Sequence, residues 1–230
     1  MKLVTDSVQS KLEIYKRIGT GLAFILFPLI FSFAFAIHPG LLNPHLFSEK
    51  GLIMRAYGND FLAFGHVLVL LCTPLLIVVA LQFMKLLDRG LSAWAGFIGG
   101  IIAVLGAVML AADKGAFCLT MSALNTLPET EFSQMMPGLL AIFSKSGWMV
   151  LLWGVICLPV GFAIQAIALL KTNVIPRWQS ALFLIGVLLV GTPDGLEIVN
   201  LTASILMAIA MVPYGIRTIA NKDSFGMQAA

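Results

Sequence analysis

Two apolar runs decide the fold of this chain: FLAFGHVLVLLCTPLLIVVALQF at residues 61–83 and LSAWAGFIGGIIAVLGAVMLAA at residues 91–112. An α-helix needs about 20 predominantly apolar residues to cross the hydrocarbon core of a bilayer, and each run is long enough to do so. The short segment between them carries Lys85 and Arg89. Because loops rich in Lys and Arg stay in the cytoplasm, this order predicts a membrane hairpin whose turn faces the cytoplasm.

The composition of the whole chain also indicates that lipid surrounds much of it. Hydrophobic residues make up 60% of the 230 residues and charged residues 11%, and the mean hydropathy is +0.99. A soluble domain carries about 25% charged residues, so this chain could not cover its surface with polar groups in water. With about 20 residues to a span, the length predicts one multi-pass domain, residues 1–230, in a plasma or inner membrane.

Six apolar runs predict an all-α bundle of six transmembrane helices. The first follows a polar start, residues 1–17, and we expect it to be retained rather than removed as a signal peptide. The fifth is short, since residues 180–191 would rise only about 18 Å as a helix. It runs into Thr192-Pro193-Asp194-Gly195, which has turn chemistry. The six spans are expected at residues 18–37, 61–83, 91–112, 148–170, 179–192 and 196–216.

The distribution of Lys and Arg predicts that both termini are cytoplasmic. With the N-terminus inside, the spans above put ten basic residues on the inner side and four on the outer side. The inner ten are Lys2, Lys11, Lys16, Arg17, Lys85, Arg89, Lys171, Arg177, Arg217 and Lys222, and the outer four are Lys50, Arg55, Lys114 and Lys145.

An amphipathic segment, residues 114–147, is expected on the outer side between the third and fourth spans. Its apolar residues from Phe132 to Phe143 recur on one helical face, which predicts an interfacial helix lying on the outer membrane surface or across the bundle mouth. Thr126 and Glu129 have capping-box spacing, so this helix is expected to begin near Leu127, with Pro137 as a candidate break. The segment either closes the bundle or gates a ligand.

Six ionisable residues are expected to gather at the outer edge of the membrane. Counting about 1.5 Å per residue from the inner basic residues places four of them at about 25–31 Å, with two more near 36 Å, against a core of about 30 Å. Ionisable groups at this depth are costly, so they are candidate ligand-binding residues. The alternative is structural: packed histidines, helix N-terminal carboxylates or interface anchors. The four are His38, His66, Asp194 and Glu197, and the two are Asp60 and Asp113.

Three functions fit this layer. In the first, an outward-facing polar cavity binds or transports a small molecule or a cation. In the second, the chain is a structural or assembly subunit of a membrane complex. In the third, it is a membrane enzyme that uses His and Asp or Glu, with His66, Asp194 and Glu197 as the ligands of any metal. The sequence has neither HExxH nor GxSxG and identifies no cofactor, so the first function is preferred to the third.

Partners are indicated only in outline. The lipid bilayer is one. Gly96 and Gly100 form a GxxxG pair, which predicts close packing against a helix of this chain or of another. The basic residues sit at span ends and form no cluster, so a nucleic-acid partner is not expected.

Overall fold

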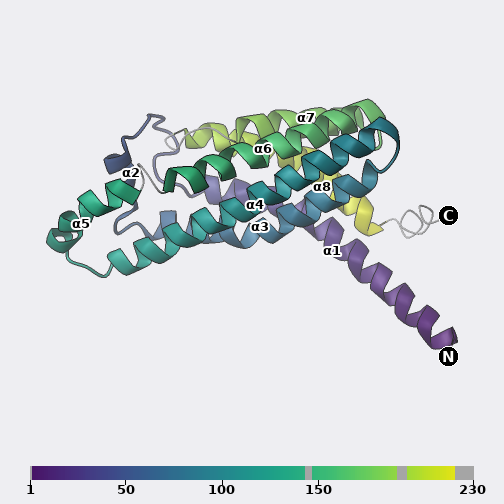
Figure 1. The fold of residues 1–230 in the computed structure, drawn as a ribbon, viewed down its shortest axis with the longest axis horizontal. Helices are drawn as coiled ribbons and strands as arrows, with labels where there is room; N and C mark the ends of the chain where they lie inside the picture. Colours follow the sequence, from purple (N-terminus) through teal and green to yellow (C-terminus); the bar gives the residue numbers. More distant parts are fainter. Residues whose placement is uncertain (1, 143–146, 191–195, 221–230) are drawn as a thin grey trace.

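The computed structural model describes residues 2–142, 147–190 and 196–220, and all the elements in these ranges are α-helices (Figure 1). The predicted all-α class is therefore confirmed for this part of the chain. The helices are α1 (Lys2–Ala36), α2 (Glu49–Ala56), α3 (Asp60–Leu86), α4 (Gly90–Leu124), α5 (Glu129–Ala141), α6 (Gly147–Thr172), α7 (Arg177–Leu189) and α8 (Glu197–Ala220).

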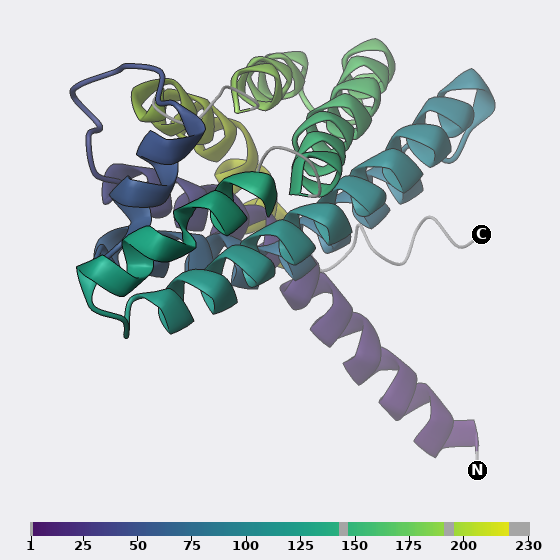
Figure 2. The same cartoon turned by 60° about the vertical axis from the view of Figure 1, so that its left-hand side comes forward.

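Six of these helices form a closed ring in chain order. α1 packs on α3, α3 on α4, α4 on α6, α6 on α7 and α7 on α8, and α8 returns to α1. The short helices α2 and α5, which we call the lid, lie together at one end of the ring, the lid end (Figures 1 and 2). The start of α1 and the end of α8 lie at the opposite end, the terminal end.

The outer surface of the ring is apolar, as a membrane requires. Four stretches are long and apolar enough to cross a bilayer: Lys11–Ala36, Asp60–Leu86, Gly90–Leu124 and Glu197–Ala220. Shorter apolar helices are Ile156–Thr172 and Arg177–Leu189. Bulky side chains stay exposed on these helices, including Phe33, Ile101 and Ile209, each at least half exposed. Lipid can cover such a surface, so the structure indicates a membrane protein.

Helix boundaries at the lid end do not follow the limits of the apolar runs. Residues 113–124 continue α4 and do not begin a separate segment, so that the 35 residues of α4 rise about 52 Å, well beyond a hydrocarbon core of about 30 Å. Apolarity ends near Ala112, but helix formation needs no lipid, and the chain stops being helical only at Asn125.

The amphipathic helix also differs from the prediction. α5 begins at Glu129 with Pro128 as its N-cap, and the Thr126 hydroxyl donates to the Ala123 carbonyl (2.7 Å), so the expected capping box does not form. The helix continues through Pro137 without ending there. Phe143, at the end of the predicted apolar face, lies outside the described residues.

The helix lengths of α1 and α7 differ in opposite directions from a typical span. α1 extends back to Lys2 as one helix that projects from the terminal end, so the polar start is helical (Figure 1). α7, the helix in the fifth apolar run, has only 13 residues. The predicted turn at residues 192–195 lies outside the described residues.

Glycines let α4 approach its neighbours within the chain. A Cβ on Gly99 would lie 2.8 Å from the Gly161 carbonyl oxygen of α6, and one on Gly96 would lie 2.7 Å from Leu87. A Cβ on Gly100 would meet Met84 of α3 and Gln165 of α6. The predicted glycine pair is thus buried against helices of the same chain, in the small-residue packing that membrane helices favour.

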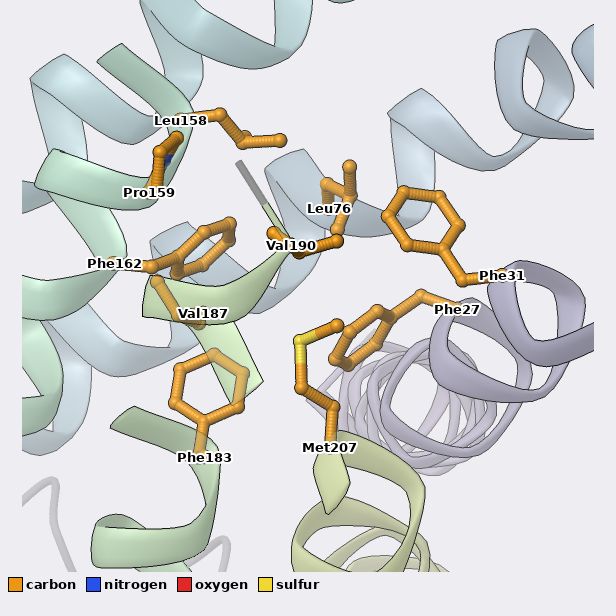
Figure 3. A pocket seen from close by; sticks show the side chains of 10 residues that line it. All are labelled: Phe27, Phe31, Leu76, Leu158, Pro159, Phe162, Phe183, Val187, Val190 and Met207. Carbon is orange, nitrogen blue, oxygen red and sulfur yellow. The ribbon is translucent and has the colours of Figure 1, made fainter. Parts of the chain in front are cut away.

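Phenylalanine rings fill the centre of the ring. We call Phe27, Phe83, Phe162 and Phe183 the aromatic plug. Phe183 contacts the other three, with ring centroids 5.4–6.4 Å apart in edge-on arrangements. Figure 3 shows three of these rings, Phe27, Phe162 and Phe183, with their neighbours around one small apolar space. The volume of this cavity is about 10 Å³, which is room for about one water molecule.

Candidate functional site

An arginine of the lid reaches the bundle at the lid end. Ser48 caps α2 by accepting from the Gly51 amide (3.2 Å), and this helix carries Arg55 in its last turn. The Arg55 Nη1 donates to Oε1 of Glu197, the first residue of α8, at 2.7 Å. The two side chains are only 11% and 4% exposed. This buried ion pair joins residues 142 positions apart in the chain.

His38 completes a three-residue cluster. α1 ends at Ala36, and the chain turns at Gly40, whose φ is +78°. A Cβ on Gly40 would lie 3.3 Å from the Arg55 guanidinium, so glycine serves both the turn and the close approach. The Nδ1 of His38 lies 3.0 Å from Arg55 Nη2 and 3.1 Å from Glu197 Oε1.

The position of one proton decides how His38 binds. A guanidinium only donates, so Nδ1 accepts from Arg55 when its proton is on Nε2. When the ring is protonated at Nδ1, that atom donates to the Glu197 carboxylate instead and faces Arg55 as a second donor. The cluster therefore has two hydrogen-bonding arrangements, and the proton on His38 selects between them.

His66 extends the cluster towards α4. Its ring centroid is 5.9 Å from that of His38 and 4.6 Å from that of Phe117. Lys114, one turn before Phe117 on α4, is close enough to His66 to act on it electrostatically and pairs with Asp113 at 3.1 Å. We call His38, Arg55, His66, Lys114 and Glu197 the lid-end cluster.

The predicted residues reach different places. His38, His66 and Glu197 come together, and Asp113 joins them through Lys114. Asp60 is exposed at the start of α3, where the neighbouring Asn59 is the N-cap. Asp194 lies outside the described residues.

Charge pairing changes the electrostatics expected of the site. The carboxylates of Glu197 and Asp113 already face Arg55 and Lys114, so neither offers an uncompensated negative charge. Over the described ranges, no group of three or more His, Cys, Asp or Glu side chains is arranged to hold a metal ion. The cluster therefore presents paired charges and two imidazoles, which suit a polar ligand that exchanges with one of the pairs.

The lid has a small hydrophobic core of its own. Phe132, Met136 and Leu139 of α5 are buried against Ile53 of α2 and against the end of α4. Tyr57 stacks on Phe132, with ring centroids 4.1 Å apart, and donates its hydroxyl to the Leu127 carbonyl (2.7 Å). The apolar face of α5 is thus largely used inside the molecule, which favours the bundle mouth over the membrane surface of the two expected placements, although Met135 remains 46% exposed. This packing ties α5 to the helix that carries Arg55.

A second polar layer lies towards the terminal end, and sequence reasoning missed it. The Nε2 of Gln165 donates to the carbonyls of Ala80 (3.0 Å) and Gly96 (3.1 Å), joining α3, α4 and α6. Gln179 donates to Ala210 of α8 (2.8 Å) and accepts from Arg217. The signal was available, since Gln165 interrupts a long apolar run, but amides were not weighed with the ionisable groups. The buried members of this layer are Arg17, Gln82, Gln165, Gln179, Ser180 and Thr218.

The molecule is thus layered along the ring axis: paired charges at the lid end, aromatic rings in the middle and amides and hydroxyls beyond them.

No protein-family model, curated protein or solved structure matches this chain.

Proposed function

We propose that this protein binds a small polar ligand at the lid-end cluster and passes it across the membrane, with the lid as its gate. The single observation that carries the proposal is the buried Arg55–Glu197 pair with His38 between its partners. It joins the lid to the ends of α1 and α8. A ligand with a charged or strongly polar group competes for Arg55 or Glu197 and thereby releases the lid.

Stability alone is a poor reason for such a pair. Desolvating two charges is costly, and replacing a buried ion pair by apolar residues is often neutral or stabilising. The apolar core of the lid already holds α2 and α5 together. Ionisable groups within membrane proteins commonly mark ligand or ion pathways. A contact that a ligand can exchange explains the placement of Arg55 better than packing does.

The structure corresponds to a closed state of the proposed route. The aromatic plug blocks the centre, and the space beside it has room for about one water molecule. Polar side chains recur on the far side of the plug. Passage therefore requires the plug rings to rotate or the ring helices to separate.

For orientation, we propose six crossings with the lid end outside. The basic residues divide accordingly, with many more at the terminal end, which the positive-inside rule assigns to the cytoplasm. Lys50→Cys should react with an impermeant maleimide from outside, and Lys16→Cys only after the membrane is opened. Both variants also carry Cys118→Ser, because Cys118 is partly exposed and would react with the reagent. The two remaining native cysteines, Cys72 and Cys157, are buried. The reverse labelling pattern would invert the proposed gate.

Ligand-induced stabilisation tests the binding itself. The purified protein is screened by thermal unfolding against small anionic, cationic and zwitterionic solutes. A ligand at 100 times its Kd adds about 2.7 kcal/mol, which raises Tm by about 5–10 °C in a chain of this size. We expect Glu197→Gln and Arg55→Gln to abolish the rise, and Glu13→Gln, in the exposed pair with Lys16, to keep it.

Two outcomes would overturn the proposal. One is a rise in Tm that survives both cluster substitutions, since the ligand would then bind elsewhere. The other is that no solute of the three charge types stabilises the wild-type protein.

A further inference from the structure

Three buried side-chain atoms of the described residues lack a hydrogen-bond partner: Arg17 Nε, Gln165 Oε1 and Ser180 Oγ. The last two lie on α6 and α7, on the terminal side of the aromatic plug. Gln165 and Ser180 are both 0% exposed. Within residues 2–142, 147–190 and 196–220, neither Gln165 Oε1 nor Ser180 Oγ has a hydrogen-bond partner. An unsatisfied buried polar group is costly, so these two atoms are candidates for hydrogen bonds to a molecule that is not part of the chain.

Ser180 differs from three other hydroxyls on the helices. The hydroxyls of Ser32, Thr172 and Thr218 each donate to the carbonyl four residues earlier, at 2.8–3.0 Å. This back-bond is the usual solution for a hydroxyl on a membrane helix. Ser180 does not use it, although complete burial makes its need greater.

Helix register places the two residues at about the same level along the ring axis. α6 and α7 pack side by side and run in opposite directions (Figure 1). The rings of Phe162 and Phe183 face each other across this interface, with centroids 5.7 Å apart. Gln165 is three residues after Phe162 and Ser180 three residues before Phe183, so each lies about one turn further towards the terminal end on the same helix face.

We propose that Gln165 and Ser180 form a second binding site, for a small uncharged molecule that both donates and accepts hydrogen bonds. Gln165 Nε2 is already engaged by two backbone carbonyls, so Oε1 remains to accept from the ligand. The Ser180 hydroxyl donates to it or accepts from it. Water, an alcohol or a small amide meets these requirements. A role for this site in transport rests on the proposed function. Binding of a molecule at the site does not depend on that function.

Occupancy is tested by the sign of a stability change. Ser180→Ala is compared with Ser204→Ala, a matched control that is also 0% exposed but donates to the Leu201 carbonyl at 2.8 Å. If Ser180 holds a bound molecule, its alanine variant loses that contact and we expect Tm to fall by about 2–4 °C below the control. If the hydroxyl is only an orphan, removing it relieves a desolvation cost, and Tm rises. A rise overturns the proposal.

Flux measurements then identify the molecule. Proteoliposomes are challenged in stopped flow with sucrose for water, and with urea or glycerol for small solutes. A urea or glycerol flux that falls at least fivefold in Ser180→Ala and not in Ser204→Ala supports a solute site on the route. A fall in water flux alone supports water as the occupant. Lowered Tm without any flux above that of protein-free liposomes supports the bound molecule and refutes the proposed transport.

Discussion

Removing the carboxylate of Glu197 should loosen the lid and destabilise the bundle together. The pair with Arg55 is 2.7 Å long and nearly inaccessible, with side chains 11% and 4% exposed. Breaking a buried pair by removing one partner costs about 3–5 kcal/mol, because the other charge is left uncompensated. For a chain of this size, Glu197→Ala should therefore lower Tm by roughly 10 °C.

The control is an ion pair of nearly the same length in a different environment. Lys16 and Glu13 are 2.9 Å apart, but their side chains are 48% and 41% exposed, and such pairs contribute at most about 1 kcal/mol. Glu13→Ala should therefore leave Tm almost unchanged. In the double variant Arg55→Ala/Glu197→Ala neither charge is left buried alone, so its cost should fall below the sum of the single costs by about 0.5–3 kcal/mol.

Hydrogen exchange adds a local measurement. In Glu197→Ala, the amides of α2 should exchange faster than those of α4, because α2 loses its link to α8. Two results would refute the reasoning: equal shifts in Tm for Glu197→Ala and Glu13→Ala, or additive effects of the Arg55 and Glu197 substitutions.

Three further predictions concern packing. Gly161→Ala should abolish stable folding, because its Cβ would meet the Ala103 backbone and lie 2.6 Å from the Gly99 oxygen; Gly19→Ala, with open space at its Cβ, should fold normally in the same size-exclusion assay. Phe183→Ala should cost about 3–5 kcal/mol in thermal unfolding and increase solute leak in proteoliposomes; an unchanged leak would argue against the plug as the barrier. Tyr57→Phe should cost about 0.5–1.5 kcal/mol through its bond to Leu127 and speed hydrogen exchange in α5, and unaltered exchange there would contradict that bond's role.

Depth counting predicted part of the candidate site. His38, His66 and Glu197 each lie on or beside an apolar run that has a basic residue at its other end, so residue counting gave their common level. Arg55 has no such reference, because it lies on a short helix outside the spans. Its position depends on the turn at Gly40 and on the lid core, which are tertiary features.

Helix ends were predicted less well than helix positions. Hydropathy reports where lipid is needed, and α4 remains helical for twelve residues past the predicted end at residue 112. The polar start of α1 is also helical, although hydropathy does not mark it, because a helix can continue outside the lipid. Gln165 carries no charge, so a criterion based on ionisable side chains does not select it, although a buried amide in a membrane also needs partners.

The closed ring has a consequence for biosynthesis. Each helix of the ring packs on the ring helix that precedes it in the chain, so it can dock as soon as it leaves the ribosome and the translocon. The contact between α1 and α8 is the exception, where Gly21 and Gly215 approach so closely that a Cβ on either would lie within 2.7 Å of the other's carbonyl oxygen. A nascent chain halted before α8 would leave a face of α1 without its partner and Arg55 without Glu197. Quality control could therefore recognise unfinished chains by that uncovered face, and the last helix to be made completes both the ring and the Arg55–Glu197 pair.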